Sequence, residues 1–195
     1  MKSTIPGGFL VAGLLAALPA WAAEEMPERE QAAKEAASAL MKELGGELKQ
    51  AMKEGGPPEA VKVCTQKAPR ITARLSRERG WQVTRVSNDF RNPLLGMPDP
   101  WEQEVLKEFE SRAEEGESLK GMGYGEVVNE PEGKFYRYMQ AIPTQEMCVA
   151  CHGPEDQLDP TVRETLQERY PHDRATGFQP GDLRGAFSIK QPVEE

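Results

Sequence analysis

Apolar side chains recur at three- and four-residue intervals over the first part of the chain. This period predicts an N-terminal helix over residues 23–56, rich in Ala, Glu, Lys and Leu. Gly45-Gly46 predicts a kink or a break inside it, because two glycines cost about 2 kcal/mol relative to alanine in a helix. A second helical stripe covers 59–79, and Pro69 should kink or break that helix because proline lacks an N–H donor.

The remaining chain mixes strand-like and helical patterns. β-branched and aromatic runs predict strands at 81–87, 126–129, 134–142 and 183–190, with a hairpin turn at 130–133 and a flexible joint at 121–125. Apolar stripes and a Pro after Asp159 predict helices over 101–115 and from Pro160 to Tyr170. Helices first, then a small antiparallel sheet with helical insertions, indicate an α+β domain.

The first 22 residues have the pattern of a secretory signal peptide. Lys2 precedes a short apolar run, and Ala20-Trp21-Ala22 has the small-x-small form of a cleavage site. The run is too short for a membrane span, which needs about 20 apolar residues. We therefore expect cleavage near Ala22, a periplasmic location, and a mature chain, 23–195, that forms one domain without a membrane span.

The net charge of the chain limits the classes of partner that it is expected to bind. The chain has 24 Lys and Arg against 32 Asp and Glu, a net charge of −8, and loss of Lys2 with the leader makes it −9. An acidic protein of this kind is a poor ligand for nucleic acid or anionic lipid, and it favours a basic or neutral partner.

The most specific motif is Cys148-Val149-Ala150-Cys151-His152. Its C-x-x-C-H spacing is that of covalent c-type haem attachment. Cys148 and Cys151 can add to the two vinyl groups of one haem, and His152 can then bind the iron. The motif predicts one covalent haem c. A C-x-x-C redox pair and a zinc site are the other readings, but zinc needs about four ligands and nothing in the spacing favours it.

Cys64 is the third cysteine of the chain. Three thiols in an oxidising compartment cannot all pair, so haem attachment at the motif leaves Cys64 alone on the apolar stripe of its helix. It is either a small buried hydrophobic residue or a sixth ligand to the iron. The other candidates for a sixth ligand are His172, Met97, Met122, Met139 and Met147.

Several stretches together resemble a known family. They are 61–69, 85–87, 91–93, 98–102, 148–153, 170–177 and 185–188. In this order they are similar to the bacterial monohaem c-type domain with a PAS-like fold, which occurs free in the periplasm or as the extracytoplasmic sensor part of signalling proteins. The resemblance implies a PAS-like small antiparallel sheet, and an iron held by the motif histidine and a cysteine of an early helix, here His152 and Cys64.

Four arginines lie in or beside these stretches, namely Arg85, Arg91, Arg174 and Arg184. Guanidinium groups suit carboxylates, and haem carries two propionates. We predict that Arg91 and Arg174 contact the propionates.

Three functions compete. A low-potential electron carrier would pass electrons to a redox partner that the sequence does not identify. A redox or gas (NO/CO) sensor would exchange an axial ligand and signal to a protein in trans. A peroxidase would need distal acid–base groups, and His172 is the only other histidine, so an enzyme is the least favoured of the three.

Overall fold

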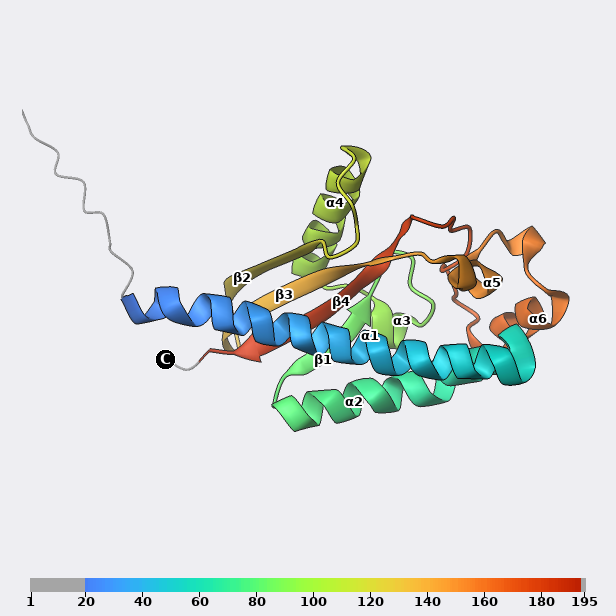
Figure 1. The fold of residues 1–195 in the computed structure, drawn as a ribbon, viewed down its shortest axis with the longest axis horizontal. Coiled ribbons are helices and arrows are strands. Elements are labelled where there is room, and N and C mark those ends of the chain that lie inside the picture. The colour runs from blue at the N-terminus through green and yellow to red at the C-terminus, as the bar shows by residue number, and fades with distance from the viewer. Residues whose placement is uncertain (1–19, 194–195) are drawn as a thin grey trace, which may run out of the picture.

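The computed structural model describes residues 20–193, and Figure 1 shows their arrangement. The expected signal peptide, 1–22, lies outside these residues except for its last three, so its cleavage stays a prediction. Among the helices of 20–193, none combines the length and apolarity needed to cross a membrane.

A four-stranded antiparallel sheet forms the centre of the domain. Its strands are β1 (Gln82–Val86), β2 (Gly123–Glu130), β3 (Gly133–Pro143) and β4 (Leu183–Pro192), in the order β1-β4-β3-β2. The hairpin between β2 and β3 closes at Glu130 and Gly133, where it was predicted. The expected α+β class is confirmed, and the sheet is consistent with a PAS-like fold.

Helices cover both faces of this sheet (Figure 1). The long α1 (Ala20–Lys62) and α2 (Ala68–Arg79) pack on one face, with Leu40, Ile71, Tyr138 and Phe187 in the core between them. On the other face lies α4 (Pro100–Glu114), over a second core that contains Phe109, Met139 and Ala186. The short helices are α3 (Pro93–Gly96), α5 (Val149–His152) and α6 (Pro160–Arg169).

The expected break at Gly45-Gly46 is wrong. α1 runs through both glycines and becomes non-helical only at Gly56, with φ 68° and ψ −160°. A Cβ built on Gly45 or Gly46 meets no atom within 4 Å, so these glycines serve no close approach. Packing of the buried stripe holds the helix despite their low propensity, since tertiary contacts outweigh intrinsic preference.

The break expected at Pro69 takes a specific form. Residues Val63–Lys67 form a π-helical turn, η1, and α2 restarts with Pro69 in its first turn. The wider turn precedes the proline, which therefore stands where its missing N–H costs nothing. Cys64 lies in this π-helical turn, and such turns are frequent at functional sites.

The predicted flexible joint at 121–125 is also corrected, because β2 begins at Gly123 rather than at residue 126. A Cβ on Gly123 would lie 2.4 Å from the Tyr138 hydroxyl, and one on Gly125 would lie 2.4 Å from the Tyr136 hydroxyl. These glycines make room for two tyrosine side chains of β3 within the sheet.

The antiparallel order brings three strand ends to one edge of the domain. β1 ends there at Val86, β4 begins there at Leu183, and β3 ends there at Pro143. In Figure 1, α5 lies at this edge, beside the end of α1 and beside α6. The chain therefore delivers the Cys-x-x-Cys-His motif and the region of Cys64 to the same place.

Candidate functional site

The three cysteines lie close together at this edge. All are free and half-buried: Cys64 in η1, Cys148 at the end of a 3-10 turn, and Cys151 in α5. Cys151 packs against a buried cluster that includes Val61 of α1. Both other thiols act electrostatically on Cys151 and help to raise its pKa. The fold thus brings together the two parts of the site that are most distant in sequence.

Burial raises the pKa of Cys151 to about 11, against a smaller opposing effect of Arg91. Redox-active C-x-x-C pairs work through a thiolate with a lowered pKa. The raised pKa of the half-buried Cys151 thiol is opposite in direction to the shift that such a redox pair needs.

The His152 ring is fixed by a backbone carbonyl. Its Nδ1 lies 2.8 Å from the carbonyl oxygen of Ala175, which can only accept, so Nδ1 carries the proton and donates it. Nε2 is then the unprotonated nitrogen, the form that binds a metal. Burial and then the nearby Arg184 and Arg91 hold the pKa of His152 well below its usual range, so the ring stays neutral.

The loop that follows α6 contacts the histidine segment through backbone hydrogen bonds and one aromatic ring. The N–H of Gly177 donates to the carbonyl of Gly153 (2.9 Å), and the N–H of Phe178 donates to that of His152 (2.9 Å). The Phe178 ring meets the imidazole edge-on, with centroids 6.4 Å apart. Such outer contacts fix the orientation of a metal-binding histidine.

Arg91 connects this loop to the motif. Its Nε donates to Asp173 (2.9 Å), and the two side chains are only 9% and 12% exposed. Its Nη2 donates to the carbonyls of Cys151 (2.6 Å) and Ala175 (3.0 Å). Asp173 in turn accepts the N–H of Ala175 (2.7 Å). The sequence placed Arg91 at the site, and the structure gives it a positioning role there; its contact with a propionate stays a prediction.

Arg174 and Arg184 differ in their contacts. Arg174 is 61% exposed, 3.7 Å from Asp89 and stacked over Phe90. Arg184, at the start of β4, donates to the Ser87 hydroxyl (3.1 Å) and lies over the Phe178 ring.

The side chain of Arg85, in β1, has no hydrogen-bond or ion-pair partner within residues 20–193, and its charge helps to lower the pKa of His152.

The other candidates for a sixth ligand lie elsewhere. Met122 and Met139 are buried in the core under α4, Met97 is 56% exposed, and His172 is exposed on its loop. Met147 directly precedes Cys148 in the 3-10 turn. No three His, Cys, Asp or Glu side chains within 20–193 gather closely enough to hold a metal ion by themselves.

Sequence reasoning missed two parts of the site. The first is the carbonyl of Ala175, which accepts from both His152 and Arg91. A backbone acceptor leaves no mark in a sequence. The second is Asp173, whose position next to His172 and Arg174 in the Pro-His-Asp-Arg stretch was a usable signal for an ion-pair partner.

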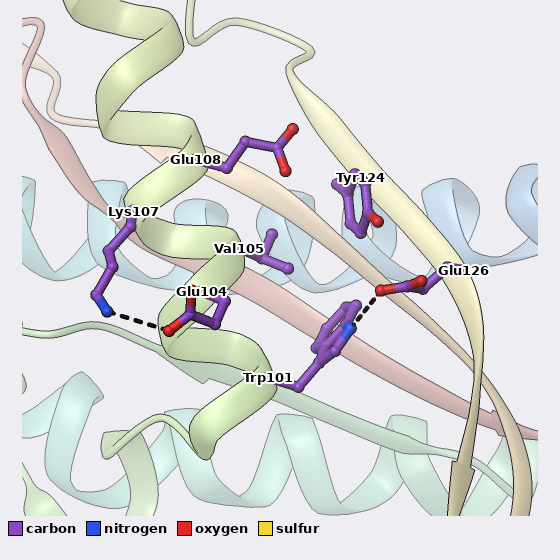
Figure 2. Close-up of a pocket in the computed structure, with 7 residues that line it drawn as sticks. All are labelled: Trp101, Glu104, Val105, Lys107, Glu108, Tyr124 and Glu126. Carbon is purple, nitrogen blue, oxygen red and sulfur yellow. Dashed lines mark hydrogen bonds and ion pairs between the residues drawn. The ribbon is translucent and has the colours of Figure 1, made fainter.

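A separate hollow of about 400 Å³ lies between α4 and β2 (Figure 2). It is lined by Trp101, Glu104, Val105, Lys107, Glu108, Tyr124 and Glu126. Two of its carboxylates already have partners, since Glu104 pairs with Lys107 (3.1 Å) and Glu126 accepts from the Trp101 indole (2.8 Å). None of the residues predicted for the site lines this hollow.

Taken together, fold and site define an α+β domain that carries a C-x-x-C-H motif and a nearby third cysteine at one edge of its sheet. The chain belongs to the Tll0287-like family, whose model, described as Tll0287, matches residues 21–192. A similar solved structure is the crystal structure of the cyanobacterial heme-protein Tll0287, with 24% sequence identity and a TM-score of 0.61. The match covers 88% of this chain and 97% of that one, and at this identity it speaks for the fold. No curated protein matches the chain.

Proposed function

We propose that this protein is a periplasmic monohaem c-type cytochrome that transfers electrons at low potential. Cys148 and Cys151 would hold the haem covalently, His152 would bind its iron through Nε2, and Cys64 would be the sixth ligand. When bound, haem supplies one-electron iron chemistry. The solved relative named above is a heme-protein, which agrees with this cofactor.

The observation that carries the proposal is the state of His152. Its Nδ1 proton is committed to the Ala175 carbonyl, and burial keeps the ring neutral, so Nε2 is ready to bind a metal. The two motif thiols are unpaired and next to it, as covalent attachment requires. The residues present therefore fit a c-type haem.

Cys64 supports the low potential. A thiolate ligand donates electron density and favours ferric iron, whereas methionine raises the potential. Cys64 is close enough to the motif to act on the pKa of Cys151, whereas Met122 and Met139 are buried in the core under α4.

The π-helical turn at Cys64 favours a second function, redox or gas sensing with a signalling protein in trans. π-helical turns are strained relative to α-helix and often mark functional positions. This turn joins α1 to α2, so a change in its geometry would be transmitted to both helices. A gas ligand that displaces Cys64 would thereby be read out as a change in helix geometry.

The test uses the full chain produced in a host that matures c-type cytochromes. We expect haem that resists acid–acetone extraction, and a ferric spectrum that changes in Cys64→Ala. Thr65→Ala is the matched control, because Thr65 lies in the same turn but bonds only the carbonyl of Lys62. Extractable haem would overturn covalent attachment, and an unchanged ferric spectrum in Cys64→Ala would overturn thiolate ligation. Displacement of a ligand by CO or NO in the reduced protein would favour sensing over electron transfer.

A further inference from the structure

Positive charge exceeds negative charge around His152. Arg85, Arg91 and Arg184 all act on the His152 imidazole, and they reach it from β1, the loop after β1, and β4. The carboxylate that shares this cluster is Asp173, which Arg91 engages. Three guanidinium groups and one carboxylate leave an excess of two positive charges in a half-buried place.

The Nε–H group of Arg184 also points toward an atom that cannot accept a hydrogen bond. Its Nε lies 3.3 Å from Nδ1 of His152, but Nδ1 carries the proton that it donates to Ala175. Two N–H groups therefore face each other, and the Arg184 Nε–H finds no acceptor in that direction. The other contacts of its guanidinium are the Ser87 hydroxyl and the carbonyl of Asp89, so within residues 20–193 its charge has no carboxylate partner.

Arg85 is the second cation available for a ligand. Its side chain has no hydrogen-bond or ion-pair partner in the described part of the chain. Its cross-strand partner is Phe187, which belongs to the core under α1 and α2, so Arg85 lies on the sheet face that those helices cover. It acts electrostatically on Arg184, on His152 and on Tyr170.

We propose that Arg85 and Arg184 bind the two carboxylates of a single dianionic ligand, the propionates of haem. The inference rests on the proposed function and replaces the expected pair Arg91 and Arg174 with a different one. Arg91 is already committed to Asp173 and two carbonyls, and Arg174 is mostly exposed beside Asp89. Two guanidinium groups balance two carboxylates in charge, and each can bind one with paired hydrogen bonds.

The first experiment compares Arg85→Gln, Arg184→Gln and the control Arg174→Gln as matured full-length proteins. Resonance Raman spectra report hydrogen bonding to the propionates through their bending band. We expect this band to shift to lower frequency in Arg85→Gln and Arg184→Gln and to stay in place in Arg174→Gln. Unchanged bands in the first two variants, or a shift in Arg174→Gln alone, would overturn the inference.

A second experiment needs no substitution and so does not depend on the folding of a variant. The full chain without haem is titrated with iron mesoporphyrin, which lacks the vinyl groups that react with thiols, and with its dimethyl ester, which lacks the carboxylates. We expect binding of the free acid to be at least about tenfold tighter. Equal affinities would overturn the carboxylate site and leave covalent haem attachment intact, whereas failure of the proposed function would show as extractable haem in the matured protein.

Discussion

Replacing Arg91 by methionine tests whether the motif is held in place by a buried ion pair. The change keeps most of the apolar volume, removes the partner of Asp173, and takes one donor each from the carbonyls of Cys151 and Ala175, the second of which keeps its hydrogen bond from His152. Arg91 and Asp173 are 9% and 12% exposed, so solvent screens this pair little.

The magnitude follows from that burial. Breaking a buried pair by removing one partner costs about 3–5 kcal/mol. For a domain of this size, each kcal/mol lowers the melting temperature by about 2–4 °C, so we expect a loss of roughly 6–20 °C. Thermal and urea unfolding, followed by circular dichroism, measure both quantities.

The matched control is Arg174→Met, since Arg174 pairs with Asp89 at 3.7 Å and is 61% exposed. It should cost less than about 1 kcal/mol, as exposed ion pairs do. A double-mutant cycle of Arg91→Met with Asp173→Asn should show strong coupling. Equal costs for Arg91→Met and Arg174→Met, with no coupling to Asp173, would refute the reasoning.

Three further predictions concern the scaffold. Gly123→Ala should lower the free energy of unfolding by about 1–3 kcal/mol, because its Cβ would meet the Tyr138 hydroxyl. Gly46→Ala, in an open part of α1, should raise the free energy of unfolding by about 1 kcal/mol. Urea unfolding compares the two variants, and a gain in stability in Gly123→Ala would contradict the packing argument. Asp99→Ala should cost about 0.5–2 kcal/mol or more, because it removes the N-cap of α4 and an ion pair with the buried Arg137 (2.6 Å); a neutral result in the same assay would show that the capping box is dispensable. Burial raises the pKa of Glu102, so the folded state binds its proton more tightly than the unfolded state does. Stability should therefore fall as pH rises from the unfolded pKa of about 4.3 through the folded value. Unfolding curves from pH 4 to 7 should depend less on pH in Glu102→Gln, and parallel curves for the two proteins would exclude Glu102 as the cause.

The strands and the cap of α6 could be read from the sequence because local signals decide them. β1 and the β2–β3 hairpin follow β-branched runs and a turn, and Asp159 caps α6 ahead of Pro160 as expected. The C-x-x-C-H motif is likewise local, since all its residues lie within five positions, although the haem attachment that it predicts stays a prediction.

The errors came from contacts that are distant in sequence. Gly45 and Gly46 remain helical because residues on the buried face of α1 pack on the sheet. Gly123 is extended because the side chain of Tyr138, fifteen residues later (138 − 123), fills the space beside it. The prediction of the site was incomplete for the same reason. The Ala175 carbonyl and the Arg184 Nε–H approach His152 only when the loop after α6 and the start of β4 pack against α5. Local sequence propensity carries no information about such tertiary contacts.

The shared carbonyl of Ala175 couples two groups that would otherwise move independently. An oxygen has two lone pairs, and here one takes the His152 proton while the other takes an Arg91 proton. A displacement of this one peptide changes the tilt of the imidazole and the hold on Cys151 together. The loop after α6 therefore sets the orientation of the imidazole and the position of Cys151 together.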